Sequence, residues 1–444
     1  MSFKLPEQVE NALFALHNAG FSAYIVGGSV RDLIMGLNPA DYDISTSASP
    51  LQTKAVFAGK KLIPTGIKHG TITVISDGMP IEITTFRTEN GYSDSRHPDS
   101  VSFAESYRQD ALRRDFTINA MAYSGEEGII DYFNGRNDIE NKLIRCVGNP
   151  DDRFKEDALR IMRAVRFAAV YGFDIEKETA AAARRNKERL LQISAERSAA
   201  ELKKLLCGKY AEKAVNEYSD ILGVLIPEIL PMRGFLQHNP HHIYDVMRHT
   251  AAVVQNTPPQ ADIRLAALFH DAGKPETFSL DENAVGHFYG HSKVSAEIAG
   301  RALKRLKFDN ETIKNAVTLV EKHDMQIDSS EKAVKRALNK LGPEMYFKLI
   351  SLKRADNKAQ SPEYLERQNE YDRAEQTARR ILKERDCFSL KELAVNGGDI
   401  IGAGVERGRQ VGEALEFLLN AVIEGKTENE KDGLIDFLKN CYMR

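Results

Sequence analysis

The chain has 444 residues, of which 42% are hydrophobic, and a formal net charge of −3, so we expect roughly two to four domains and no indiscriminate binding of polyanions. The four cysteines are scattered without close pairs, which excludes a disulfide framework or a thiolate zinc site. No run of eighteen apolar residues and no signal-peptide pattern occurs, so we expect a soluble, cytoplasmic protein without a membrane partner.

An amphipathic helix is expected over residues 7–19, and short β-rich runs separated by turns follow it. From about Asp151 the pattern changes to long helical periods, with a late helix near 408–424, and we expect no further strands. The predicted fold class is therefore α+β, with a mixed-sheet head and an all-α remainder. The expected strands are Ala23–Val26, Thr71–Ile75, Ile81–Phe86 and Gly128–Tyr132.

The proline-punctuated segment 226–240 predicts a domain boundary, because histidine-rich sequence begins just after it. A second, softer boundary is expected near 361, where charged helical sequence begins. The expected domains are a head over 1–150, a helical neck over 151–226, a histidine-rich domain over 227–360 and a helical tail over 361–444.

Residues 24–43 combine a glycine pair, an arginine and two aspartates. Gly27 and Gly28 lack β-carbons, so backbone N–H groups there could approach a triphosphate, and Arg31 adds positive charge. Asp41 and Asp43 are two positions apart, which on a strand directs both carboxylates to one face, where they could hold Mg²⁺. A strand-to-helix turn would explain the glycines but not these charges, so the stretch predicts metal-dependent nucleotidyl transfer.

Two nearby stretches could complete such a site. Glu82, in the strand expected over 81–86, is either a third carboxylate near the metal or an edge-strand glutamate facing water. Arg113 and Arg114 precede an apolar helical start at Phe116, which suits a guanidinium held against a phosphate better than a solvated turn.

A later helix carries a ladder of charged residues. Asp157, Arg160, Arg163 and Arg166 step by three, while apolar residues cover another side of the same expected helix. Ordinary surface ion pairs are the alternative. Three arginines for one aspartate predict a net positive stripe, which an anionic ligand would neutralise.

In this order and spacing, these motifs resemble those of the class II CCA-adding tRNA nucleotidyltransferases and the related bacterial poly(A) polymerases. The resemblance covers roughly residues 20–210 and implies template-independent addition or repair of the 3′-terminal CCA of tRNA from CTP and ATP. The motifs are Gly-Gly-Ser-Val-Arg-Asp at 27–32, Asp-Tyr-Asp at 41–43, Arg-Arg-Asp-Phe-Thr-Ile-Asn-Ala at 113–120, residues 131–135, and Glu-Asp-Ala-Leu-Arg at 156–160.

The resemblance also implies roles for single residues. It implies that Asp41 and Asp43 hold the catalytic metals, and that Gly28, Arg31 and Arg114 contact the incoming nucleotide.

On the later helix, the resemblance implies that Asp157 and Arg160 read the base, that Arg163 and Arg166 lie nearby, and that Glu156 orients the reading pair. A carboxylate accepts from the amino group of cytosine or adenine, whereas uracil and guanine offer the wrong pattern.

Residues 87–108, with Asp94 and Arg96, contain few apolar anchors and are expected to form a surface loop. CCA-adding members carry a mobile loop there that is needed for the final adenosine, so its presence disfavours an enzyme that adds only cytidines. Addition of A alone stays open.

Eight of the eleven histidines fall between positions 238 and 323. The set His249, His270, Asp271 and Asp356 resembles the HD-domain metal phosphohydrolases, whereas a lone buried histidine is more often a satisfied core residue. Either His291 and His323 complete a dinuclear centre, or they are surface histidines. The metal could be Mg²⁺ or a divalent transition metal such as Mn, Ni, Co or Fe, and the expected substrates are phosphomonoesters or 2′,3′-cyclic phosphates at RNA ends.

The leading hypothesis is therefore a CCA-adding tRNA nucleotidyltransferase fused to an HD phosphohydrolase module, with a tail that grips tRNA away from its acceptor end. A poly(A) polymerase or an A-adding enzyme is the alternative within the class. The alternative from another class is an HD phosphohydrolase that binds RNA and carries an inert nucleotidyltransferase half. Intact Asp41 and Asp43 argue against the last alternative. The oligomeric state is left open.

Overall fold

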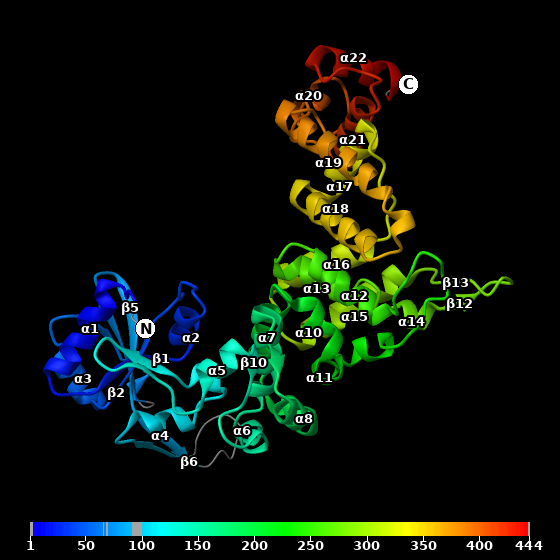
Figure 1. The fold of residues 1–444 in the computed structure, drawn as a ribbon. Helices are drawn as coiled ribbons and strands as arrows, with labels where there is room; N and C mark the ends of the chain where they lie inside the picture. The colour runs from blue at the N-terminus through cyan, green and yellow to red at the C-terminus, as the bar shows by residue number, and fades with distance from the viewer. Residues whose placement is uncertain (1–2, 65, 68–69, 91–99, 443–444) are drawn as a thin grey trace. The chain divides into compact units, whose positions relative to one another are not determined.

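The computed structural model describes residues 3–64, 66–67, 70–90 and 100–442, and it divides into two compact units at 1–227 and 228–444 (Figure 1). Asp94 and Arg96 lie outside the described residues. Within the described part of the chain, no helix is long and apolar enough to cross a membrane.

The first unit contains a seven-stranded mixed sheet whose strand order is β3-β4-β5-β2-β1-β8-β9. Neighbouring strands are antiparallel except for β2 and β5, which run parallel and place Asp43 opposite Glu82. The strands are β1 Ala23–Val26, β2 Asp43–Thr46, β3 Lys61–Ile63, β4 Thr71–Ser76, β5 Met79–Thr85, β8 Ala122–Ser124 and β9 Gly128–Ile130.

Strand β1, in the interior of the sheet between β2 and β8, is buried at every residue, as expected for a short apolar run covered on both faces. Helices α1 (Glu7–Asn18) and α3 (Pro50–Val56) pack against each other and against the sheet (Figure 1). Near the sheet lie α2 (Gly28–Ile34), α4 (Tyr107–Leu112) and the 3₁₀ turn η2 (Thr117–Asn119).

The neck part of the first unit is mostly helical. Helix α7 carries a long buried face that packs on α9 and α10, so it forms the core of this part. After the sheet, the head ends with α5 Gly135–Glu140 and β10 Leu143–Ile144. The elements that follow are α6 Pro150–Glu156, α7 Leu159–Tyr171, β11 Asp174–Ile175, α8 Lys177–Asn186, η3 Lys187–Gln192, α9 Ala195–Leu206, α10 Ala211–Glu217 and α11 Ser219–Leu225.

The second unit begins near the 3₁₀ turn η4 (Pro227–Met232). Helices α12, α13, α15, α16 and α18 pack together and position the histidine cluster. They span α12 Val246–Asn256, α13 Ala261–Phe269, α15 His291–Arg305, α16 Asn310–Lys322 and α18 Pro343–Lys358, with the short elements α14 Lys274–Thr277, β12 Ser279–Leu280 and β13 Gly286–His287 between α13 and α15.

The rest of the second unit has two further apolar cores. One lies between α17 (Glu331–Leu341), α18 and α19 (Arg367–Glu384), which η5 (Pro362–Tyr364) precedes. The other is formed by α20 (Gly397–Gly402), α21 (Arg409–Ile423) and α22 (Lys431–Cys441).

The α+β prediction is confirmed, since a mixed-sheet head precedes a largely helical remainder. The remainder is not strictly all-α, however. β10 pairs with β11, and β12 pairs with β13, and strands of two residues are too short to show an alternating pattern. The division at 227 falls in the proline-punctuated segment, and the other domain boundaries stay predictions.

Two further expectations about local structure were wrong. The interval 87–108 is not simply a loop, because β6 (Arg87–Asn90) pairs with β7 (Ser100–Phe103) there. The expected helix beginning at Phe116 is only the 3₁₀ turn η2, because Phe116 bridges to Cys146 and Thr117 N–H donates to the Arg145 carbonyl. Tertiary pairing here overrides the local helical pattern.

Candidate active site and metal centre

A polar cavity of about 570 Å³ lies in the first unit. Nearly all the residues expected at the nucleotidyl-transfer site line it, although they come from segments far apart in the chain. The predicted residues that line the cavity are Gly27, Gly28, Arg31, Asp41, Asp43, Glu82, Arg113, Arg114, Asp157, Arg160, Arg163 and Arg166.

Three carboxylates converge on one wall of this cavity. Asp43 begins β2 and is in register with Glu82 on β5, so the two side chains share a face of the sheet. β5 lies between β4 and β2, so Glu82 is not on an edge strand. Asp41 precedes the strand, and buried Tyr42 separates it from Asp43. All three carboxylates are exposed to the cavity.

Arg114 forms a neighbouring part of the wall, and its position requires a glycine at 27. A Cβ at Gly27 would lie 2.9 Å from Arg114 Nη1, and the backbone there has a φ of 73°. Arg114 Nη1 donates to the Asn119 carbonyl at 3.3 Å, and Nη2 donates to Ser45 Oγ at 3.3 Å. The glycine therefore admits the guanidinium as well as forming the turn.

Asp110 is a residue of this region that the sequence analysis missed. Its side chain is fully buried and accepts from Arg113 Nε at 2.9 Å and from Arg114 Nη2 at 3.2 Å. Burial opposes ionisation, but the two guanidinium groups hold the pKa of Asp110 below its usual range. The sequence did contain a signal for this contact, because Asp110 lies three and four positions before the two arginines, and residues at that spacing are neighbours on a helix.

Arg31 connects α2 to other parts of the first unit. Its Nη1 donates to Asn119 Oδ1 at 2.6 Å, and its Nε donates to Asp32 Oδ1 at 2.9 Å. The guanidinium carbon lies 4.7 Å from the ring centroid of Tyr171 and 5.2 Å from that of Phe167, both on α7. These contacts orient Arg31 rigidly beside the cavity.

The predicted single helix with a charged ladder is interrupted at Asp157. Helix α6 ends at Glu156, Asp157 is extended, and α7 begins at Leu159. Asp157 Oδ1 accepts the Leu159 N–H at 3.0 Å, which favours the break. Asp157 Oδ2 accepts from Arg197 Nη2 at 2.9 Å. Arg197 lies 40 positions away, so no local pattern could have revealed it.

The expected net positive stripe is also wrong, because each arginine of α7 has an acidic partner. Arg160 Nη1 donates to Glu156 Oε2 at 2.6 Å. Arg163 Nε donates to Asp115 Oδ2 at 2.7 Å, and Arg166 Nε to Glu201 Oε2 at 2.5 Å.

Asp115, the partner of Arg163, is buried and strongly acidic. Burial disfavours its charged form, but Arg163, an Asn119 hydrogen bond and Arg160 lower the pKa of Asp115 to about 2. Asp115 and Asn119 belong to the Arg-Arg-Asp-Phe-Thr-Ile-Asn-Ala motif, and the motif alone gave no role to either. Both hold the arginines that line the cavity.

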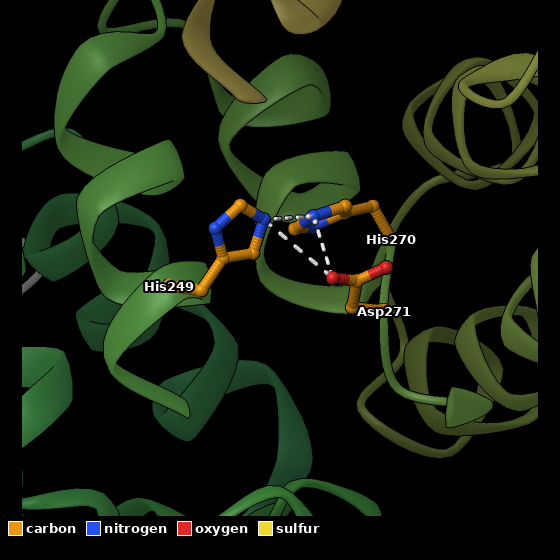
Figure 2. Close-up of side chains that lie close together, drawn as sticks. All are labelled: His249, His270 and Asp271. Atoms are coloured by element: carbon orange, nitrogen blue, oxygen red, sulfur yellow. Dashed lines mark hydrogen bonds and ion pairs between the residues drawn. The ribbon is translucent and has the colours of Figure 1, made fainter. Parts of the chain in front are cut away.

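In the second unit, His249, His270 and Asp271 point toward one another (Figure 2). The Nε2 atoms of the two histidines are 3.3 Å apart, and Asp271 Oδ2 lies 3.3 Å from His270 Nε2 and 3.6 Å from His249 Nε2. Asp356 Oδ1 lies 3.1 Å from His249 Nε2. The expected ligand residues therefore come together from α12, α18 and the end of α13.

A second trio shares the same aspartate. His291 and His323 have their Nε2 atoms 3.1 Å apart, and they lie 3.4 and 3.8 Å from Asp271 Oδ1. Both histidines are buried, so neither is a surface residue. The two carboxylate oxygens of Asp271 thus face different histidine pairs, which is the arrangement of a bridging ligand.

Each of the four histidines has its Nδ1 next to a backbone carbonyl. The acceptors are Ala359, Ala267, Phe288 and Val320 for His249, His270, His291 and His323, at 3.3, 2.8, 2.8 and 2.6 Å. Because a carbonyl can only accept, Nδ1 carries a hydrogen, and the Nε2 of a neutral ring presents a lone pair. Burial disfavours a second proton on His270, but the Asp271 carboxylate raises the pKa of this ring. Facing lone pairs repel, so each Nε2 pair favours a cation between them.

The carboxylates of this cluster are held in their charged form. Burial disfavours ionisation of Asp271, but His270, Lys274 and His291 hold the pKa of that carboxyl well below its usual range. Lys274 Nζ lies 2.8 Å from Asp271 Oδ2. Ionised oxygen and imidazole nitrogen form a donor set for a divalent cation once that cation replaces the proton on His270.

Three families match successive parts of the chain. Residues 23–145 match the poly A polymerase head domain, residues 172–232 match a probable RNA- and SrmB-binding site of polymerase A, and residues 277–438 match a putative tRNA nucleotidyltransferase domain 2.

Relatives match over nearly the whole length. The CCA-adding enzyme of Levilactobacillus brevis is 34% identical over 97% of this chain and 98% of its own. That of Limosilactobacillus fermentum is 35% identical over 97% and 96%. Among solved structures, the Bacillus stearothermophilus CCA-adding enzyme in complex with CTP has a TM-score of 0.74 and 30% identity, covering 99% of this chain and 98% of its own. With its cavity, its charged motifs and these full-length matches, the chain belongs to the family of CCA-adding enzymes and is a tRNA nucleotidyltransferase.

Proposed function

We propose that the head cavity joins CMP and AMP from CTP and ATP to the 3′-terminal hydroxyl of tRNA, with Asp41 and Asp43 as the metal-holding carboxylates. The observation that carries this assignment is the convergence of both aspartates and Glu82 beside Arg114 in one cavity. Solved relatives with CTP, with ATP and with tRNA support the choice of substrates.

The three carboxylates fit Mg²⁺. Oxygen ligands are those that Mg²⁺ prefers, and like charges gathered here need a counter-charge. Partial desolvation inside the cavity, followed by repulsion from Asp41 and Glu82, raises the pKa of Asp43 to about 6. When bound, Mg²⁺ supplies neutralisation of the triphosphate and lowers the pKa of the attacking hydroxyl.

The arginines of the cavity then orient the nucleotide. Arg114 is fixed by Asp110 and Ser45, so it can meet a phosphate without losing much side-chain freedom. Arg31 is similarly anchored, and Arg113 lines the same wall. The Gly27 N–H donates to the Met121 carbonyl, so a phosphate would instead meet the backbone that follows from Gly28.

Base choice is assigned to Asp157 and Arg160. Asp157 already binds Arg197, and Arg160 is held by Glu156 and by the Arg113 carbonyl at 2.9 Å. A pair fixed in this way presents an acceptor and a donor in a constant geometry, which suits cytosine and adenine. Arg163 and Arg166 lie behind the pair with their own acidic partners.

For the second unit we propose a metal-dependent phosphohydrolase that acts on phosphomonoesters or 2′,3′-cyclic phosphates. The observation that favours this proposal is that two histidine pairs share the Asp271 carboxylate. In each pair the two Nε2 atoms face each other. His249, His270, Asp271 and Asp356 would hold one cation, and Asp271, His291 and His323 a second. When bound, such ions supply a hydroxide nucleophile at neutral pH.

Replacing Asp41 or Asp43 by Asn should abolish incorporation of both CMP and AMP, because the remaining carboxylate cannot hold the metals alone. The measurement is the incorporation of CMP and AMP into three RNA substrates: tRNA lacking its 3′ end, tRNA ending in CC, and an unstructured RNA. Asp77→Asn, at an exposed turn between β4 and β5, is the matched control and should retain activity. Substantial CMP addition by either site variant would refute the assignment.

Asp157→Ala should relax discrimination against UTP and GTP while some turnover remains, since the acceptor for the base amino group is lost. Loss of one such contact is worth on the order of 1–3 kcal/mol of discrimination. The ratio of kcat/KM for CTP and UTP measures it, with Asp152→Ala on the exposed face of α6 as the control. Unchanged selectivity with a lower rate would assign this region to phosphate binding alone.

Glu82→Gln should lower the pKa of Asp43 in the metal-free protein, because one of the repelling charges is removed. The folded-state pKa lies above the ordinary 3.8, so ionisation destabilises the metal-free fold as the pH rises toward 6. Carbon-13 NMR of labelled aspartate carboxyl groups, assigned with Asp43→Asn, reports the midpoint. A midpoint that stays near pH 6 would show that Glu82 does not act on Asp43.

His270→Ala and Asp271→Ala should lose bound divalent metal and any phosphohydrolase activity while nucleotide addition survives, because their helices belong to the second unit. Asp41→Asn should show the reverse pattern. Metal content by mass spectrometry and both activities are measured on each variant. If addition and hydrolysis fell together in folded variants, the two sites would be coupled.

A further inference from the structure

The β12–β13 hairpin ends beside the histidine cluster in an exposed aromatic ring. Tyr289 is 78% exposed, far more than a tyrosine with a packing role would be. It lies two positions before His291, so their Cα atoms are at most about 7 Å apart. Only Gly290 therefore separates this exposed ring from a proposed metal ligand in the chain.

The ring is held in place from behind. Tyr289 stacks on His287 with centroids 5.4 Å apart and an interplanar angle of 5°. His287 Nε2 is 3.0 Å from Asp281 Oδ2, at the other side of the hairpin. On the cluster side, the Phe288 carbonyl contacts His291 Nδ1 at 2.8 Å. Because His287 supports the ring of Tyr289 and the Phe288 carbonyl fixes the adjacent backbone, little side-chain freedom would be lost if a planar ligand stacked on this ring.

Tyr289 lines the same cavity as four members of the cluster, and the volume of this cavity is about 310 Å³. These members are Asp271, His291, His323 and Asp356. Such a volume is near the lower end for small-molecule sites. The cavity also contains Lys274, which is 5% exposed, donates to Gln237 Oε1 at 2.8 Å and lies 2.8 Å from Asp271 Oδ2. The cavity thus combines a buried cation and part of the metal donor set with an exposed aromatic ring.

We propose that Tyr289, supported by His287, is a stacking platform for the nucleobase of a nucleotide whose phosphate lies at the His/Asp cluster. The substrate class of this centre would then be nucleotides, free or at an RNA 3′ end, in preference to phosphate esters without a ring. Stacking accepts any base, so the platform selects for a base and not for its identity. This inference rests on the proposed phosphohydrolase.

Binding is tested in the full-length protein with 2-aminopurine riboside 2′,3′-cyclic phosphate, whose fluorescence is quenched on stacking, in EDTA and in Mg²⁺. Tyr289→Ala should weaken the quenching interaction about tenfold, and Tyr289→Phe should retain it because the ring remains. Leu280→Ala, exposed on the same hairpin but outside the cavity, should behave as wild type. The head site is the same in every variant, so any quenching from probe bound there cancels when the variants are compared.

Kinetics provide the second readout. Tyr289→Ala should raise KM for adenosine 2′,3′-cyclic phosphate about tenfold with little change in kcat, and leave hydrolysis of glycerol 1,2-cyclic phosphate unchanged. The same probe placed at the 3′ end of an RNA hairpin distinguishes an RNA end from a free nucleotide as the source.

Quenching that does not depend on Tyr289, or equal losses with both cyclic phosphates, would overturn the platform. If wild type hydrolysed neither compound but still bound the probe through Tyr289, the phosphohydrolase would be wrong and the nucleotide site would stand.

Discussion

The buried carboxylate of Asp110 is the interaction on which the head cavity depends. It receives hydrogen bonds from Arg113 and Arg114 and reaches Ser45 on β2, so one side chain connects α4 to β2. Removing one partner of such a buried pair leaves a charge uncompensated, which costs about 3–5 kcal/mol. The space for Arg114 in turn exists because residue 27 is glycine.

Charge in the head cavity is balanced by pairing, and the arginines are not left as a bare positive surface. Asp115, Glu156 and Glu201 each hold an arginine of α7, while the carboxylates opposite remain exposed. A triphosphate with its metal ions brings charges of both signs, so a cavity with fixed groups of both signs suits it. The proteins whose solved structures contain CTP or ATP share this fold.

The second unit gathers its histidines around one carboxylate, Asp271, whose counter-charge is Lys274. Four imidazole nitrogens face each other in pairs around Asp271, and backbone carbonyls fix every ring from the far side. Such a cluster is stable as a metal site and costly without one. Tyr289 follows the β12–β13 hairpin and lies two residues before His291 of this cluster, and both line one cavity.

The sequence by itself determined features that depend on short spacing: strand β1 and the glycine turn after it, helix α1, the α+β class and the His-Asp doublet after an apolar helix. Hydrophobic periodicity and turn chemistry act over a few residues, so they can be read directly. Tertiary structure alone decided that Asp157 leaves the helix to meet Arg197, that Arg166 pairs with Glu201, and that Asp271 faces two histidine pairs. These contacts join residues that are far apart in the chain. The packing of whole helices brings such residues together, and no local sequence pattern predicts it.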